Sequence, residues 1–567
     1  MIEKMTKYSW ILLSSDNESF LEELRSLGVI DIRRSSKPVD ESSAAMLQEI
    51  ESLKTRVYEL ETGSDAELSV LLKRKIALEN EFNGVAPWGE FDKGRLENLG
   101  VPISFHCVEK KKFNPLWEEE YALQVVSQDN GLVRFVVLGD SNPPVPAIAA
   151  PERSAAAVSG EIQDLDRQIS EHKAFLEKEK ASIPTLNERI DRLQSDLSLY
   201  LAGCCGQKEA DERLIVYEGF APSSSDAALG EAFEKMNVVC LKEEAAVEDN
   251  PPIKLRNNRF VRMFEVLTDM YGRPKYDGFD PTPYLSIFFL LFFSMCIGDA
   301  AYGIILILVG LLFKKKLGNI APLVVTLGVG STMVGLYFHT FFSIDITTWG
   351  WIPDSVKALM LPAKIAGYDG AMILSLVIGI IHLLLAMIVK TIYATRNKGF
   401  LESLGTWGWT IFWLGLTVIG AFALAGILDK EVTKWAIITL GAICAIGIFP
   451  LNNIHRNPLI NVGSGLWDTY NMASGILGDV LSYLRLYALG LAGAMLGLSF
   501  NGLAAMVLGD GGVVGWIGFV LLVVFGHTLN LAMAVLGAFV HPLRLNFLEF
   551  FKNSDYDGSG VKYEPIK

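Results

Sequence analysis

The chain has 567 residues and a formal net charge of −14. An acidic balance of this size argues against a nucleic-acid partner, because nucleic-acid-binding proteins present basic surfaces to phosphate. The six cysteines show no spacing typical of metal ligands, and we expect neither a metal ion nor another cofactor. The N-terminal segment has too short an apolar stretch and too many charges for a signal peptide, so we expect it to stay in the cytoplasm.

Half of the residues are hydrophobic, but they are unevenly distributed along the chain. Residues 1–278 are rich in charge, whereas residues 279–567 contain several apolar runs of the length that spans a lipid bilayer. We therefore predict a cytoplasmic α+β domain at 1–278, followed by an α-helical polytopic membrane domain at 279–567.

The two ends of the first domain predict one proximal lobe, made of residues 1–40 and 206–278. Its sequence pattern gives strand, helix and strand twice. The first set lies at 7–13, 17–27 and 29–34, and the second at 213–222, 226–236 and 237–242. We expect the two β-α-β pieces to pack on each other.

Between these ends, residues 41–85 and 151–205 show the apolar spacing of a coiled coil. The seam residues are Ile50, Leu53, Val57 and Leu60 in the first arm, and Leu186, Ile190, Leu193 and Leu197 in the second. Residues 86–150 are rich in strand formers and predict a distal α/β lobe. The simplest arrangement is an antiparallel coiled-coil hairpin with a lobe at each end, a dumbbell, in which Pro184 must kink or break the second arm. The alternative is a generic dimerisation arm.

The apolar half predicts eight transmembrane helices with both termini in the cytoplasm, because Lys and Arg concentrate on that side. The first run, 283–313, ends at Lys314, Lys315 and Lys316 and must re-enter as a tight hairpin that turns near Gly298 and Asp299. The later runs are 320–343, 370–392, 405–428, 434–450 (followed by His455 and Arg456), 472–507 and 513–550. The last two exceed a perpendicular span, so we expect them to be tilted.

Arg485 is the most informative residue of the membrane half. A charge in the middle of a membrane helix costs about 2.5–3.5 kcal/mol on insertion scales, and arginine cannot deprotonate to avoid that cost. Gly493 and Gly497 follow in a GxxxG spacing, among further small residues that would let another helix pass close to the charge. The alternative is a buried structural ion pair within the chain's own bundle.

Further polar residues follow one side of the last apolar run. They are His527, Asn530, His541 and Arg544. The deeper two, His527 and Asn530, are candidates for lining a water path, whereas Arg544 lies near the cytoplasmic end. Asp299 is the single acid of the first hairpin. His339 and His382 add titratable groups, although a lone histidine on an apolar helix is more often a packing residue.

Several segments together resemble the membrane stator subunit of V-type and A-type ATPases, called subunit a in eukaryotes and subunit I in prokaryotes. The resemblance covers essentially the whole chain. The segments are VYEGFAP (216–222), FDPTPYLSIFFLLFFSMCIGDAAYG (279–303), SYLRLYALGLAGAML (482–496) and HPLRLNFLEFF (541–551). It implies a dumbbell cytoplasmic domain and eight membrane helices, the last two tilted against a rotor ring.

The resemblance also assigns functional residues. It implies that Arg485 is the family's essential arginine, that Arg544 is its second arginine, and that Ser482 opens the essential motif. Some eukaryotic members carry an acid about ten positions before the second arginine, where this chain has Ala534. The acid of the ion path must therefore come from elsewhere, with Asp299 as one candidate, or polar groups must replace it.

The implied function is that of a non-catalytic stator subunit that couples H⁺ or Na⁺ translocation to rotation of a proteolipid ring. Its expected partners are the ring, peripheral stalk subunits and other subunits of the ATPase, in a prokaryotic plasma membrane. No Walker A pattern occurs in the sequence, so ATP chemistry must lie on other subunits. A secondary transporter or channel with a coiled-coil domain is the alternative, but we find no internal repeat. A membrane-anchored scaffold would leave Arg485 unexplained.

Overall fold

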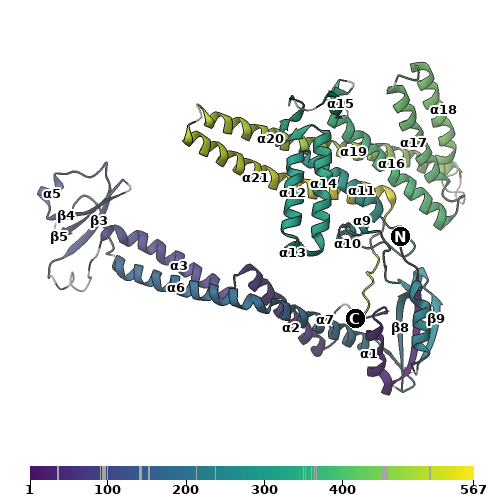
Figure 1. The fold of residues 1–567 in the computed structure, drawn as a ribbon, viewed down its shortest axis with the longest axis horizontal. Coiled ribbons are helices and arrows are strands. Elements are labelled where there is room, and N and C mark those ends of the chain that lie inside the picture. The colour runs from purple at the N-terminus through teal and green to yellow at the C-terminus, as the bar shows by residue number, and fades with distance from the viewer. Residues whose placement is uncertain are drawn as a thin grey trace. The chain divides into compact units, whose positions relative to one another are not determined.

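The computed structural model describes residues 1–566 except 35–36, 90, 92–97, 99, 130, 140–142, 151–152, 212, 237, 349, 351–352, 359, 363, 366, 425, 450–457 and 510–511. By their internal contacts the residues form two compact units. The first comprises Met1–Asp16, Leu27–Ile32 and Lys208–Pro565, and the second comprises Asn17–Ser26 and Arg33–Gln207 together with Ile566. Figure 1 shows the elements of both units.

The first unit contains an antiparallel sheet with the strand order β2-β8-β1-β9, in which β7 also pairs with β8. Its strands are β1 (Met5–Leu13), β2 (Asp31–Ile32), β7 (Gln207–Glu209), β8 (Leu214–Pro222) and β9 (Val239–Glu244). The predicted strands are thus present, but they interleave: β8 lies between β2 and β1, and β1 lies between β8 and β9. Trp10 on β1 is fully buried against Phe233 of α8 (Asp226–Phe233), so apolar packing fixes the helix on the sheet.

The end of the chain packs beside this sheet, which the sequence did not indicate. Ile253 pairs with Lys562, and the backbone N–H of Glu564 donates to Asp31 Oδ2 at 2.9 Å. Lys275 forms an ion pair of 2.5 Å with Asp557, and this pairing holds the pKa of the Asp557 carboxyl below its usual value. The segment after the last helix is therefore tied to the loop that precedes the first apolar helix.

The second unit contains two pairs of helices. Its longer helices are α1 (Asn17–Leu27), α2 (Glu41–Thr62), α3 (Ala66–Val85), α6 (Ala155–Glu179) and α7 (Ile183–Cys204), and all of these except α1 belong to the two pairs. Helix α2 packs against α7 and α3 against α6, around an apolar core that includes Leu60, Leu68, Leu165, Ile169 and Leu176. The break at Pro184 is confirmed, because α6 ends before it and the proline lies in the first turn of α7. A matching break at Gly63, which is left-handed with φ 65°, was not predicted.

A four-stranded antiparallel sheet with the order β4-β5-β3-β6 follows α3 in the same unit. Its strands are β3 (Ile103–Glu109), β4 (Leu123–Asp129), β5 (Leu132–Leu138) and β6 (Ala147–Ile148), with a short helix α5 (Trp117–Glu120). Alternate residues of β5 are buried, namely Val133, Phe135 and Val137. This period of two is what the strand-forming composition of 86–150 indicated.

Among the residues that the structure describes in the apolar half, five helical stretches are long and apolar enough to cross a membrane. They are Lys314–Tyr337, Gly370–Lys398, Leu404–Ala423, Gly465–Leu508 and Val513–Ser554. Two shorter apolar helices precede them, α11 (Thr282–Ile297) and α12 (Ala300–Leu312). The predicted turn between these two is confirmed, since Gly298 is left-handed and Asp299 caps α12. The predicted markers His455 and Arg456 lie outside the described residues.

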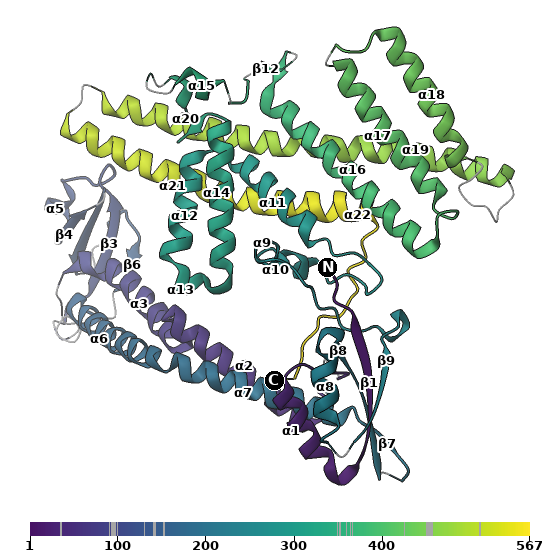
Figure 2. The ribbon, with the colours of Figure 1, turned by 45° about the vertical axis from the view of Figure 1, so that its right-hand side comes forward.

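The remaining elements of this half have the following bounds. They are α9 (Arg259–Arg262), α10 (Glu265–Tyr271), α13 (Lys314–Leu317), α14 (Ala321–Tyr337), β10 (Thr340–Phe341), β11 (Ile344–Asp345), α15 (Asp354–Lys357), β12 (Lys364–Ile365), β13 (Tyr368–Asp369), α16 (Gly370–Lys398), α17 (Leu404–Leu424), α18 (Lys430–Ile448), α19 (Pro458–Ser482), α20 (Leu484–Leu508), α21 (Val513–Arg544), a π-helix η8 (Leu545–Phe550) and α22 (Phe551–Ser554). Figure 2 shows α20 and α21 side by side, in agreement with their extensive contacts.

Three predicted runs differ from the helices observed. The run 320–343 ends as a helix at Tyr337 and continues as a β-hairpin whose turn includes the left-handed residues Phe342 and Ser343. The run 472–507 begins earlier, in α19, and is interrupted at Tyr483. The run 513–550 leaves α-helical geometry after Arg544. Apolar run length does not report such local changes in hydrogen bonding.

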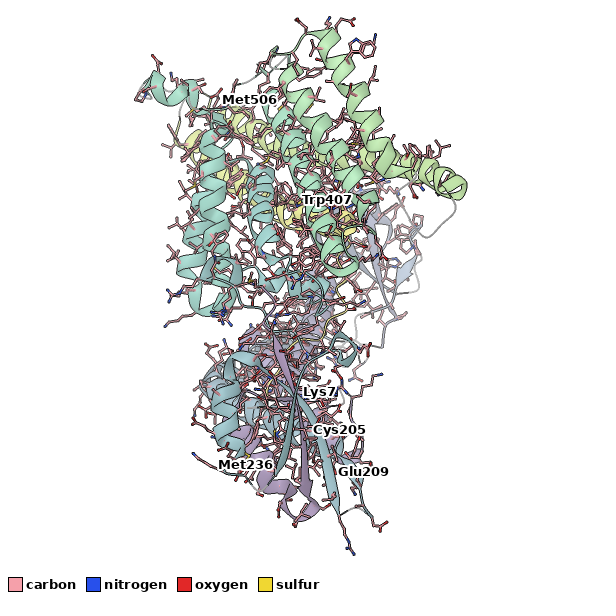
Figure 3. The ribbon with its side chains drawn as sticks, turned by 90° about the vertical axis from the view of Figure 1, so that its right-hand side faces the viewer. Lys7, Cys205, Glu209, Met236, Trp407 and Met506 are labelled. Carbon is pink, nitrogen blue, oxygen red and sulfur yellow. The ribbon has the colours of Figure 1, made fainter. Side chains whose placement is uncertain are left out.

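Helices α11, α12, α14, α16, α20 and α21 share a core rich in aromatic side chains. It includes Phe264, Phe289, Phe292, Tyr483, Leu486, Phe550 and Phe551. Trp407 of α17, which is labelled in Figure 3, donates its Nε1–H to Thr395 of α16 at 2.9 Å. Met506, also labelled there, lies near the end of α20 and is 79% exposed. The bundle therefore joins its helices by apolar and polar contacts but leaves large apolar surfaces on α20 and α21 uncovered.

Candidate functional site

Arg485 lies directly after the break between α19 and α20. At this break the backbone N–H of Leu486 donates to the carbonyl of Tyr483 at 3.0 Å, three residues earlier, instead of following the α-helical pattern. The Arg485 side chain is half-buried, and its Nη1 atom is buried without a hydrogen-bond partner in the described part of the chain. The guanidinium is therefore held in the bundle with donor capacity left open.

An exposed stripe continues from Arg485 along α20. Residues at helical spacing on this side are small or flexible and exposed, namely Ala488, Ala492, Met495 and Ser499. The opposite side of the same helix is buried and carries Leu486 and Gly497. The backbone position of Arg485 is thus in line with this exposed stripe, a surface that a second helix can approach closely, while its Nη1 atom is buried.

The predicted GxxxG pair has a different neighbour from the one expected. The peptide oxygen of Gly493 accepts from Asn530 Nδ2 at 2.8 Å, and a Cβ at Gly497 would overlap Ser343. These two glycines therefore allow close packing of the chain's own α21 and of the turn at 342–343 against α20. The small residues available to a passing helix are those of the exposed stripe.

One cavity of about 660 Å³ brings Ser482 and Arg544 together. Its polar lining also includes Asp479, Glu549, Lys552 and Asp555. Glu549 is 4% exposed, and its Oε2 atom has no hydrogen-bond partner among the described residues. Ser482 and Glu549 line the same cavity, and the Glu549 carboxylate also lies within electrostatic range of both Arg485 and Arg544.

Glu549 is a candidate that the sequence analysis missed, although it stands inside the segment HPLRLNFLEFF. In an α-helix, residues five apart point about 140° away from each other, which would turn Glu549 from Arg544. The segment Leu545–Phe550 is instead a π-helix, with hydrogen bonds from i to i+5. Residues five apart then point to much the same side of the helix, and both side chains line the same cavity. The only signal in the sequence was a lone acid in an apolar stretch.

A second cavity, of about 260 Å³, lies against the next turn of α20. Its lining includes Gly298, His339, Thr340, Leu486, Tyr487 and Gly490. Ser482 lines the first cavity and Leu486 lines the second, so Arg485 falls within the single helical turn that separates their linings.

Asp299 is buried, with 3% of its surface exposed, and its carboxylate is engaged by four backbone N–H groups. Two belong to the first turn of α12, where Ala301 donates at 2.9 Å and Tyr302 at 3.4 Å. The other two belong to the left-handed turn, where Phe342 donates at 3.1 Å and Ser343 at 2.6 Å. The carboxylate therefore caps a helix and also holds a turn in a conformation that non-glycine residues seldom adopt.

His527 and Asn530 meet at Tyr302, a residue that the sequence did not single out. The Tyr302 hydroxyl lies 2.7 Å from His527 Nδ1 and accepts from Asn530 Nδ2 at 2.9 Å. On its other side, His527 Nε2 lies 2.9 Å from Asn501 Oδ1. The Asn501 amide in turn donates to the carbonyl of Phe342 at 2.9 Å. This chain of hydrogen bonds leads to the turn that Asp299 holds.

Apart from Arg485, most of the predicted residues, together with the unpredicted Glu549, fall into two groups. Ser482, Arg544 and Glu549 line the larger cavity. His541 lies within electrostatic range of both arginines, and its Nδ1 atom has no partner in the described chain. Asp299, His527 and Asn530 belong to the hydrogen-bonded network on α12 and α21. Among the described residues there is no group of three His, Cys, Asp or Glu side chains arranged to hold a metal ion.

Comparison with known proteins agrees with the resemblance noted from the motifs. The model of the V-type ATPase 116kDa subunit family matches residues 147–347 and 473–567, more than half of the chain. The chain is 26% identical to V-type ATP synthase subunit I 1 of Treponema pallidum over the full length of both proteins. It is also 26% identical to A-type ATP synthase subunit I of Methanocaldococcus jannaschii, over 86% of this chain and 71% of that protein. The chain belongs to the V-type ATPase 116 kDa subunit family.

Proposed function

We propose that this chain is the non-catalytic membrane stator subunit of a rotary V/A-type ATPase. In this role it forms two ion half-channels against a ring of proteolipid subunits and couples H⁺ or Na⁺ translocation to rotation. One observation carries the proposal: Arg485 has an unpartnered guanidinium nitrogen between two cavity linings, on the side of α20 that continues as an exposed stripe of small residues. The names of its relatives, which are subunits of A-type and V-type ATP synthases, support the assignment.

The proposed mechanism follows from the cost of an unpaired charge. A ring carboxylate that has released its ion is an anion in a medium of low dielectric, where attraction to a fixed cation is strong. Arg485 compensates that charge where the two half-channels end. Its positive charge also repels the transported cation, which prevents a direct leak between the half-channels, so that ions must travel around with the ring. Moving one charge across 100 mV is worth about 2.3 kcal/mol, so several ions pass for each ATP.

We assign the larger cavity to the cytoplasmic half-channel, with Ser482, Arg544 and Glu549 in its lining. Glu549 supplies the acid that is missing at Ala534, and its buried, partly unpartnered carboxylate is suited to accepting a cation from water. The opposite half-channel uses His527 and Asn530 around Tyr302, and Asp299 contributes through the turn that it holds. His541 lies on α21 within electrostatic range of the two arginines and contributes to the polar surroundings of Arg485.

The same proposal includes the topology. The five long apolar helices, together with α11, α12 and α18, give eight membrane crossings with both termini in the cytoplasm of a prokaryotic cell. The soluble domain is a dumbbell with a proximal lobe (1–40 and 206–278), coiled-coil arms (41–85 and 151–205) and a distal lobe (86–150). It anchors the peripheral stalk subunits and resists the torque of rotation.

Replacement of Arg485 tests the function. In the purified complex reconstituted into vesicles, Arg485→Ala should reduce ATP-driven ion pumping to below about 1% of wild type, a loss of at least ~2.7 kcal/mol, while the complex still assembles. Arg396→Ala is the matched control, because it removes an exposed arginine at the end of α16. Normal pumping by Arg485→Ala would refute the proposal. Ion transport by the isolated chain, without ring or stalk subunits, would instead indicate an autonomous transporter.

A further inference from the structure

His382 of α16 is a buried titratable residue that lines neither cavity. Its side chain is 0% exposed, and its Nδ1 atom lies 2.8 Å from the hydroxyl of Tyr483. The ring stacks on Phe550 with a centroid distance of 4.8 Å and an interplanar angle of 13°, and it also contacts Phe288 at 4.2 Å. One imidazole therefore touches both segments that carry the arginines: Tyr483 lies two residues before Arg485, and Phe550 lies in the π-helix that follows Arg544.

Tyr483 is the residue at which the long helix breaks. It is 0% exposed, and its ring lies against Gly379 of α16, where a Cβ would overlap the ring. The ring is thus fixed by close contact with a glycine and by a hydrogen bond to His382. The apolar residues before and after Tyr483 make neither of these contacts. Both contacts therefore act at the residue where the helix breaks.

Fixing Tyr483 fixes the direction of Arg485. Residues two apart in a helix are rotated by about 200° about its axis, so their side chains leave from nearly opposite sides. Because Tyr483 is anchored toward α16, Arg485 is placed toward the opposite, open side. Leu486, which is also 0% exposed, holds the next position on the buried side. Without the anchor, a break that is not fully α-helical would let the first turn of α20 rotate.

The second contact of His382, its stacking on Phe550, bears on the position of Glu549. Phe550 stacks on the imidazole, and it directly follows Glu549, whose carboxylate lines the same cavity as Arg544. The π-helical register that brings Glu549 to Arg544 is therefore packed against the residue that holds Tyr483. The arginine and the acid share one support on α16.

We propose that Tyr483 and His382 form a positioning pair, which sets Arg485 toward the rotor and keeps the adjoining π-helix in register. Neither residue contacts the ion or the ring. The inference rests on the proposed function, since it assigns the pair a role in coupling ion flow to rotation. Because a displacement of about 1 Å at a functional group is enough to cost up to ~100-fold in rate, loss of the hydrogen bond is expected to impair coupling.

The test uses the whole complex in vesicles and measures ions pumped per ATP hydrolysed, normalised to assembled complex. Tyr483→Phe and His382→Leu should each lower this ratio by roughly 10-fold. His382→Asn should retain most of it, because an amide places a hydrogen-bonding atom near the position of Nδ1. Tyr8→Phe is the matched control, since it removes another buried phenol, bonded to Asp226 at 2.8 Å in the soluble sheet. It should pump as wild type.

The double variant Tyr483→Phe/His382→Leu guards against misfolding, because it leaves no buried partner unpaired. It should assemble as wild type and still couple poorly. Wild-type coupling per assembled complex in Tyr483→Phe or in the double variant would overturn the positioning role, and so would an equal loss in His382→Asn and His382→Leu. Arg485→Ala, run in parallel, separates the two proposals. If it pumps normally, the function itself fails, whereas if it is inactive while Tyr483→Phe is normal, only the positioning pair fails.

Discussion

The helical arms and the apolar bundle treat their charged groups in opposite ways. In the arms, Asp65 accepts from His172 at 2.9 Å, Arg56 pairs with Glu179 at 2.5 Å, and Lys75 pairs with Asp166 at 2.6 Å. In the bundle, Arg485 Nη1, His541 Nδ1 and Glu549 Oε2 are buried without a partner in the described chain.

The free energy of these interactions would favour the opposite arrangement of paired and unpaired groups. An ion pair in water is worth about 0–1 kcal/mol, whereas a buried polar group without a partner costs roughly 1–3 kcal/mol, and more if charged. The arms therefore pair these charged groups where pairing gains least, whereas the bundle leaves atoms of Arg485, His541 and Glu549 open where that costs most. Such a cost is expected only where something from outside the chain completes the site.

The open carboxylate of Glu549 gives the largest expected effect. Glu549→Gln keeps the size of the side chain but removes its charge, so ATP-driven pumping by the complex should fall by roughly 100-fold, or ~2.7 kcal/mol. Glu431→Gln, at the exposed start of α18, is the control for the same chemical change. If Glu549→Gln pumps normally, the open carboxylate has no part in transport and the contrast between the two regions loses its functional meaning.

Two glycines of α20 test how closely the apolar bundle is packed at two positions. Gly497→Ala places a methyl group against Ser343 and should destabilise the bundle by about 2 kcal/mol through overpacking. Gly502→Ala, five residues on, meets nothing within 4 Å and should be neutral or slightly stabilising, because alanine favours the helix. Thermal unfolding of the purified chain in detergent compares the two. Equal effects would mean that the turn at 342–343 is not held between α12, α20 and α21.

Which site residues could be predicted from the sequence depended on whether they carried a charge or followed a regular helical spacing. Arg485 was identifiable because an intramembrane cation has few explanations, and the turn at Gly298 because charge on both flanks required a hairpin. Glu549 was missed because a π-helix changes the angular spacing that pattern analysis assumes. Tyr302 and Asn501 were missed because they are uncharged, and only the tertiary fold brings them to His527. The GxxxG pair was assigned to a passing helix, since sequence spacing does not identify the partner.

Substitution of a charged residue in the helical arms is expected to have the smallest effect on stability, because these charges are near water. Asp65 caps α3 by accepting from the N–H of Leu68 at 2.8 Å. Burial alone would raise the pKa of this carboxyl, but the bonds from Leu68 and His172, together with the nearby Arg56, hold the pKa below its usual value of 3.8. A lowered pKa in the folded state means that the stabilisation is complete at neutral pH and is lost as the pH falls below 3.8 through the native value.

Asp65→Asn keeps the cap, since asparagine caps helices about as well, and removes only the charge. The free energy of local opening near Gly63 and Pro184 should drop by ~0.5 kcal/mol at pH 7. Hydrogen exchange of the peptides on both sides of the two breaks measures this quantity. The wild-type advantage should vanish at pH values below the native pKa of Asp65, where both carboxyl and amide are neutral. An advantage that persists in acid would show that the arms are held at this joint by packing alone, and the paired charges there would no longer contrast with the open ones around Arg485.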